Sequence, residues 1–177
     1  MNAGVEALVR SYRSRISDPD MSFAPTIPPR KLRNALKSYA LGAQKEEVLA
    51  LIDTSYFGGA KRGCLLTDKR VYAKNLGQAP ASLDLNEIDS VECEEEAQGL
   101  LFMRGKSLLV QASEIHINGK PFLWIRARKN PQTLPTFAQM LKEIASLGRS
   151  SETGAGMNQL KELEIARTSC LWCGSRN

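Results

Sequence analysis

The stretch GCLLTDKRVYAK, residues 63–74, carries the clearest strand pattern of the chain. Two short apolar segments, residues 63–67 and 70–74, flank the polar pair Asp68-Lys69. The side chains of Thr67 and Asp68 can hydrogen-bond nearby backbone amides, which favours a tight turn. The stretch therefore predicts two strands that are joined by a short turn.

Further short segments with strand character lie on both sides of this pair. Residues 48–52 form the apolar run VLALI and are followed by Asp53. On the other side, residues 82–85 read SLDL, and Ile88 and Val91 bracket the start of a further segment that continues to about residue 94. We expect each of these segments to form a strand.

Two more hairpins are expected later in the chain. Residues 100–103 and 108–111 flank a turn at 104–106, and residues 115–117 and 122–125 flank Asn118-Gly119. Asn-Gly between apolar segments is the strongest short hairpin signal, because both residues tolerate positive φ. This number of short strands between turns favours a sandwich or a barrel.

The last clear element is an amphipathic helix. Its apolar residues recur at steps of three and four, as in a helix with one buried face: Leu134, Phe137, Ala138, Leu141, Ile144 and Ala145. Thr133 can cap the helix and Gly148 can end it. The open end of a small barrel is the expected place for this apolar stripe.

Two stretches resemble a known family. Residues 66–72, LTDKRVY, resemble the second-to-third-strand signature of bacterial pleckstrin-homology-like (PH-like) domains and their GRAM-type relatives. Residues 83–91, LDLNEIDSV, resemble the next landmark, a strand that leads into an Ile-x-Ser-Val turn. With the C-terminal helix, the resemblance covers roughly residues 46–147.

The resemblance implies a fold and a class of function. The implied fold is mainly β: a strongly bent antiparallel barrel of about seven strands, closed at one end by the C-terminal α-helix, with N-terminal helices appended. Members of this type often serve in assembly or as adaptors. Eukaryotic relatives bind lipid headgroups, usually through basic residues between the first two strands.

Four segments follow from these patterns. Residues 1–30 form an N-terminal arm, with an amphipathic helix over 3–17 and a Pro-rich, extended linker over 18–30. Residues 31–45 form an accessory helix that packs on the domain, and residues 46–148 form the PH-like domain. Residues 149–177 form a flexible tether, a short helix and a tail with the motif Cys170-x-x-Cys173.

The positive charge of the chain is concentrated at its N-terminal end. The whole chain has a net charge of +5, and residues 1–45 alone carry +5, whereas residues 46–148 carry −1. A core that is close to neutral is a poor binder of phosphate backbones, so nucleic acid is not an expected partner. The chain has no apolar run of the roughly 20 residues needed to span a bilayer and no secretory signal pattern, so we expect a soluble, cytoplasmic protein.

The leading hypothesis is a non-enzymatic binding module that contacts a protein partner or assembles with itself as a homo-oligomer. Tyr12 and Ile16 lie in the apolar stripe of the N-terminal helix, which can dock on a protein groove. Phe122 and Trp124 lie on the last strand, whose exposed edge can pair with another chain.

The alternative hypothesis is peripheral membrane or phospholipid-headgroup binding. Arg10, Arg13 and Arg15 flank the apolar stripe of the N-terminal helix, and such a helix can lie on an anionic surface. Lys61 and Arg62 follow Gly58-Gly59 and fall near the place where the family's lipid-binding residues are found.

Catalysis, metals and cofactors are not expected. His116 is the only histidine, and no nucleophile-elbow motif accompanies it. The pair Cys170 and Cys173 is half of a typical zinc ribbon, although a site shared between subunits stays open. Cys64 and Cys93 each lie alone in an expected strand. A role as a small core residue is the favoured interpretation for Cys64, and it is less strongly favoured for Cys93.

Overall fold

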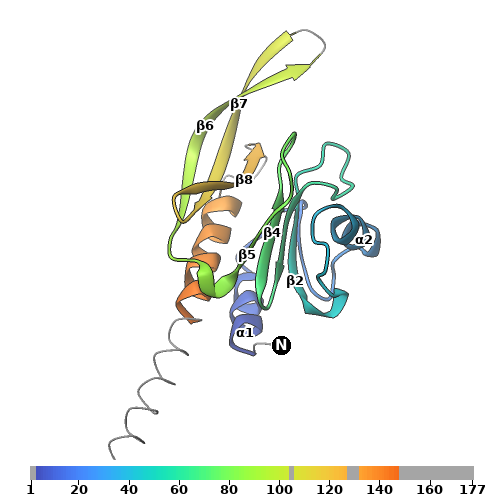
Figure 1. The fold of residues 1–177 in the computed structure, drawn as a ribbon, viewed down its shortest axis with the longest axis vertical. Helices are drawn as coiled ribbons and strands as arrows, with labels where there is room; N and C mark the ends of the chain where they lie inside the picture. Colours follow the sequence, from blue (N-terminus) through green and yellow to red (C-terminus); the bar gives the residue numbers. More distant parts are fainter. Residues whose placement is uncertain (1–2, 104–105, 127–131, 148–177) are drawn as a thin grey trace, which may run out of the picture.

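The computed structural model describes residues 3–103, 106–126 and 132–147. In this part of the chain the strands form two antiparallel sheets, one in the order β1-β2-β3-β4-β5 and one in the order β6-β7-β8 (Figure 1). The first sheet contains β1 Met21–Phe23, β2 Val48–Asp53, β3 Gly63–Thr67, β4 Arg70–Lys74 and β5 Ala81–Asp84. The second contains β6 Val91–Met103, β7 Lys106–Ile117 and β8 Lys120–Arg126. The helices are α1 Ala3–Tyr12, α2 Pro29–Ser38, the short 3₁₀ helices η1 Lys45–Glu47 and η2 Leu85–Glu87, and a helix over residues 133–147.

The two strands predicted from residues 63–74 are confirmed as β3 and β4. Thr67 closes the turn between them, because its hydroxyl oxygen accepts hydrogen bonds from the backbone N–H of Lys69 (3.3 Å) and of Arg70 (2.9 Å). The register pairs Leu66 with Val71 and Gly63 with Lys74. A side-chain acceptor in the turn thus fixes this hairpin, as the sequence predicts.

The second sheet is simpler than expected. The segments predicted separately at 91–94 and 100–103 are one strand, β6, and those at 108–111 and 115–117 are one strand, β7. The Asn-Gly turn between β7 and β8 is confirmed, with φ of +53° at Asn118 and +70° at Gly119. Asn118 also ties this turn to the preceding connection, since its Oδ1 accepts from the N–H of Asp89 (2.8 Å) and of Ser90 (3.1 Å).

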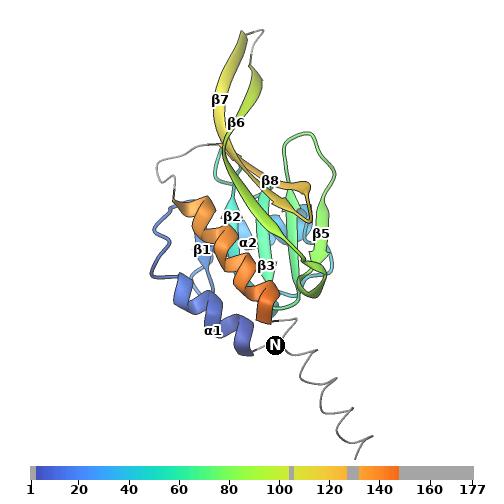
Figure 2. The same ribbon diagram turned by 90° about the vertical axis from the view of Figure 1, so that its left-hand side faces the viewer.

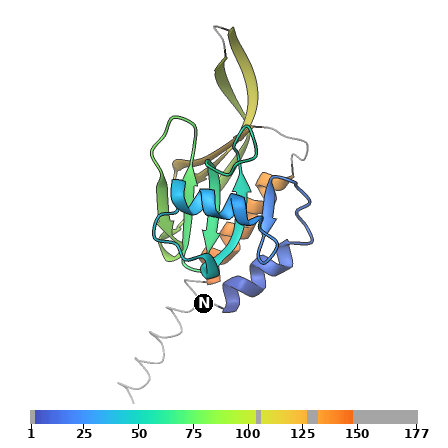
Figure 3. The ribbon, with the colours of Figure 1, turned by 90° about the vertical axis from the view of Figure 1, so that its right-hand side faces the viewer.

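The five-stranded sheet is covered on both faces. α2 lies on one face (Figure 3), and α1 with the helix of residues 133–147 lies on the other (Figure 2). Each residue of β2 and of β3 is buried as a result. Leu32, Ala35 and Tyr39 pack with Leu51 and Leu65 on the α2 side. On the other side, the predicted apolar stripe of the C-terminal helix is buried against both sheets: Leu134, Phe137, Ala138, Leu141, Ile144 and Ala145.

The predicted closed barrel of about seven strands is not found. In the described residues there are eight strands in two separate sheets, with three-residue β1 and four-residue β5 at the edges of the first. The chain passes from β5 through η2 before β6 begins, so these two strands do not pair in the described structure. The coarser expectation, antiparallel β structure with a C-terminal helix packed on it, is confirmed.

The N-terminal region differs from the arm and linker that the sequence predicts. α1 ends at Tyr12, earlier than the predicted residue 17, and Val5, Val9, Tyr12 and Ile16 pack in the main core. Within the predicted linker, Met21–Phe23 form β1, which pairs with β2 through Met21–Ile52 and Phe23–Ala50. The segment from α1 to β1, residues 3–23, is therefore part of the folded body.

Among the described helices, none has both the length and the apolar character needed to cross a bilayer.

Candidate functional site

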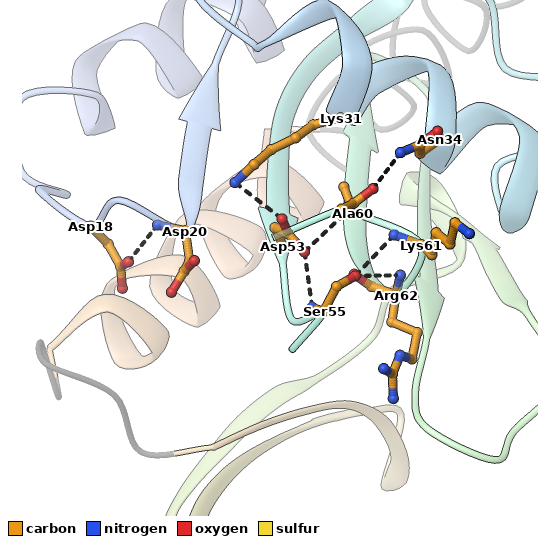
Figure 4. Close-up of polar contacts among 10 residues, drawn as sticks. Asp18, Asp20, Lys31, Asn34, Asp53, Ser55, Ala60, Lys61 and Arg62 are labelled. Atoms are coloured by element: carbon orange, nitrogen blue, oxygen red, sulfur yellow. Dashed lines mark hydrogen bonds and ion pairs between the residues drawn. The ribbon is translucent and has the colours of Figure 1, made fainter. Parts of the chain in front are cut away.

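The loop between β2 and β3, residues 54–62, is held by the buried carboxylate of Asp53 (Figure 4). Asp53 is 1% exposed, and its Oδ1 accepts hydrogen bonds from the backbone N–H of Ser55 (2.9 Å) and of Ala60 (3.0 Å). Its Oδ2 lies 3.0 Å from Nζ of Lys31 on α2. A single carboxylate thus joins the two ends of the loop to the neighbouring helix.

Ser55 fixes the second half of the same loop. Its buried hydroxyl oxygen accepts from the N–H of Lys61 (2.9 Å) and of Arg62 (3.2 Å) (Figure 4). Two contacts then join the loop to α2: the Asn34 amide donates to the Gly59 carbonyl (2.7 Å), and the Ser38 hydroxyl donates to the Lys61 carbonyl (2.8 Å). The loop and α2 therefore form one tied unit.

Two aromatic side chains project from the tip of this loop. Phe57 is 93% exposed and Tyr56 is 58% exposed, and their rings meet edge to face with centroids 4.9 Å apart. Two adjacent exposed aromatic rings offer more apolar surface than the single exposed apolar side chains that are common on proteins. The backbone before and after these two residues is held by the hydrogen bonds to the side chains of Asp53 and Ser55.

Positively charged side chains lie on this loop and on the helix that is hydrogen-bonded to it. α2 contributes Arg30, Arg33 and Lys37, which are exposed, lie at helical spacings of three and four, and are not accompanied by an acidic residue in the helix. Lys61 on the loop is also exposed, whereas Arg62 is half-buried. We call Arg30, Arg33, Lys37, Tyr56, Phe57 and Lys61 the basic–aromatic face.

The structure does not bring the predicted cations together. Arg10, Arg13 and Arg15 belong to α1 and the turn after it, on the opposite side of the five-stranded sheet from α2 (Figures 2 and 3). Arg10 pairs with Glu6 (2.8 Å), and Nη2 of Arg13 lies 3.5 Å from the Thr26 hydroxyl. The Arg15 guanidinium lies over the Tyr12 ring, 4.9 Å from its centroid. Only Lys61 and Arg62 of the predicted set lie beside α2.

The predicted protein contacts on α1 are occupied within the chain itself. Tyr12 is 1% exposed and Ile16 is 7% exposed, and both belong to the main core. Contact of a partner with these two side chains would require α1 to leave the domain. The sequence correctly indicates an apolar face here, but the face covers the chain's own sheet.

The predicted edge strand is also partly occupied. Phe122 is buried, and Trp124 is half-buried on β8. The Asn75 side chain binds this edge: its Oδ1 accepts from the N–H of Trp124 (2.9 Å), and its Nδ2 donates to the Phe122 carbonyl (3.2 Å). Pairing of another strand at these two residues would have to displace Asn75. Homo-oligomer formation stays a prediction, which absolute molar mass from light scattering would test.

The cysteines lie in two different situations. Cys64 is buried in the core, and this burial raises the pKa of its thiol, so the thiolate needed for metal or redox chemistry is disfavoured. Cys93 is half-buried on β6. Cys170 and Cys173 lie outside the described residues.

Sequence reasoning missed most of the basic–aromatic face. The charges of α2 and the turn at residues 56–59 are visible in the sequence, but the contacts that unite them join residues more than twenty positions apart. Comparisons with protein-family models, with curated proteins and with solved structures give no match for this chain. The interpretation of the site therefore rests on its geometry and charge.

Proposed function

We propose that the chain is a non-enzymatic, PH-like binding module that docks on an anionic phospholipid surface through the basic–aromatic face. The observation that carries the proposal is the exposure of Phe57, 93%, at the tip of a loop that is tied to a cationic helix. Two antiparallel sheets followed by a C-terminal helix support the PH-like part of the proposal. The proposal therefore assigns lipid binding to Arg30, Arg33 and Lys37 of α2 in place of the arginines predicted near the N-terminus.

Electrostatic attraction would supply one part of the binding free energy. Each Lys or Arg near an anionic membrane contributes about 1 kcal/mol. Four exposed cations belong to the face, namely Arg30, Arg33, Lys37 and Lys61. Lys31 is not counted with them because it is paired with Asp53. Binding should therefore weaken as salt concentration rises.

Insertion of the aromatic pair would supply the other part. Phe57 is an apolar side chain that is already in water, so its transfer to the acyl boundary gains hydrophobic free energy. Tyr56 carries a polar hydroxyl beside an apolar ring, which suits the headgroup level. Because the loop backbone is tied by Asp53 and Ser55, little further ordering is needed when the tip inserts.

Vesicle co-sedimentation of the full chain tests the proposal. Wild-type protein should bind phosphatidylcholine vesicles that contain phosphatidylserine and should not bind phosphatidylcholine alone. The double variant Arg33→Ala/Lys61→Ala should lose about 2 kcal/mol, or about 30-fold in affinity. Phe57→Ser should weaken binding to the same vesicles in a salt-independent manner.

Matched controls exist on other surfaces. Lys120→Ala removes an exposed cation from the start of β8, and Leu147→Ser removes a 42% exposed apolar side chain from the last residue of the C-terminal helix. Both controls should bind like the wild type. Failure of the wild-type chain to bind anionic vesicles at low salt would refute the proposal and return attention to a protein partner.

A further inference from the structure

Three metal-ligating side chains meet on the outer face of the three-stranded sheet. Glu94 on β6 and Glu114 on β7 are directly opposite each other in the register. His116 follows Glu114 by two residues, so its side chain lies on the same face of the strand. One ligand atom of each residue lies within 4.8 Å of those of the other two. These three residues are called the outer-sheet cluster.

The histidine of this cluster lacks an ordinary hydrogen-bond partner at Nε2. This atom is out of contact with solvent and accepts or donates no hydrogen bond in the described structure. The nearest carboxylate oxygen, Oε2 of Glu114, is 3.4 Å away, which is longer than a normal hydrogen bond. The side chains of His116 and Glu114 are only 19% and 23% exposed. The nitrogen is thus placed beside a carboxylate without being satisfied by it.

Irregularities in the strands border the cluster. The β6–β7 register shifts between Glu94 and Ala97, and the β7–β8 register shifts between Ile115 and His116. Such bulges bend a strand and re-aim its side chains, and they are frequent beside functional sites. Glu92 is directly opposite His116, so a further carboxylate belongs to the same face. Three carboxylates therefore lie on the face of the sheet that carries His116.

We propose that the outer-sheet cluster binds a first-row divalent transition cation such as Zn²⁺, through Glu94, Glu114 and Nε2 of His116. Imidazole suits zinc and its neighbours in the series better than it suits Mg²⁺ or Ca²⁺. Zinc binds nitrogen at about 2.0–2.1 Å and carboxylate oxygen at about 2.0–2.2 Å, so the ligand atoms must approach one another by side-chain rotation. Exposed Glu94 can make this movement. A bound cation would also neutralise the facing carboxylates.

The cluster offers a direct experimental readout, because His116 is the only histidine of the chain. We would titrate Zn²⁺ into the full chain and follow the imidazole ¹H–¹⁵N resonances. The variant Cys170→Ser/Cys173→Ser serves as the parent protein, so that these thiols do not compete for the metal. A one-to-one change in the imidazole signals is the expected result.

Ligand variants separate this site from general charge effects. Glu94→Gln and Glu114→Gln should each weaken Zn²⁺ binding by at least about tenfold, since loss of an outer-shell partner alone costs about 10–100-fold. Glu46→Gln removes an exposed carboxylate from η1 and should bind like the parent. Backbone amide spectra would verify that each variant is folded. Unchanged imidazole signals in the parent, or equal affinity in all three variants, would overturn the proposal.

Discussion

Gly63 begins β3 at a position where the structure has no room for a side chain. Its φ is +134°, and a Cβ atom placed there would lie 1.9 Å from the carbonyl oxygen of Ile52. Gly63→Ala should lower the free energy of unfolding by about 1–3 kcal/mol from backbone strain alone, and the collision adds to this loss. Chemical denaturation measures the change. Gly59→Ala is the control, since a Cβ at Gly59 meets nothing within 4 Å and the stability should hardly change.

A second prediction concerns the cross-strand pair of Arg70 on β4 and Asp84 on β5. The guanidinium donates two hydrogen bonds to the carboxylate, one of them from Nη2 to Oδ2 at 2.9 Å. Hydrogen bonds from Arg70 hold the pKa of Asp84 below its usual value. The pair therefore stabilises the fold above the unfolded-state pKa of about 3.9, and this contribution is lost as the pH falls through the lowered pKa of Asp84.

Denaturation of the wild type and of Asp84→Asn at several pH values measures this effect. The difference in unfolding free energy should be constant above about pH 5 and should shrink at lower pH. It should be small throughout, because both side chains are partly exposed to water. A difference that grows on acidification would contradict the assignment.

At the scale of elements, α1 and β1 are structural parts of the domain. A chain that starts at Pro29 should lack a cooperative thermal transition, because burial of one large apolar side chain stabilises a fold by about 1.5–3 kcal/mol. Six such side chains would be lost: Val5, Val9, Tyr12, Ile16, Met21 and Phe23. Their sum is comparable with the whole stability of a typical domain, about 5–15 kcal/mol. A chain that starts at Ala3 is the control and should melt normally by circular dichroism.

Short sequence patterns predict some elements of this fold and miss others. They predict β3, β4 and the Asn118-Gly119 turn, because the turn residues and apolar runs lie within a few adjacent positions. β1 was not predictable, since three residues between prolines carry no usable period and the strand exists only by pairing with β2. The loop tie of Asp53 was not predictable for the same reason, because its partner Lys31 comes from a helix earlier in the chain.

At the scale of the whole molecule, the sequence shows which segment is rich in Lys and Arg but not which of these residues share a surface. The excess of Lys and Arg in residues 1–45 is real, yet the fold divides it between α1 on one side of the five-stranded sheet and α2 on the other (Figures 2 and 3). Only the α2 portion lies on an element that is hydrogen-bonded to the loop with the exposed aromatic side chains. A sequence shows how many charges a segment holds, whereas the packing of the helices decides which of them share a surface.

Because both faces of the five-stranded sheet are covered, its central strands should tolerate few amino-acid substitutions. In a strand with one solvent-exposed face, every second position accepts polar substitutions with little effect. β2 has no such position, because its residues from Val48 to Asp53 are all buried, and the one carboxylate among them holds the loop of residues 54–62. Saturation mutagenesis should find this strand intolerant along its entire length, while the exposed positions of α2 change freely unless the surface they present is under selection.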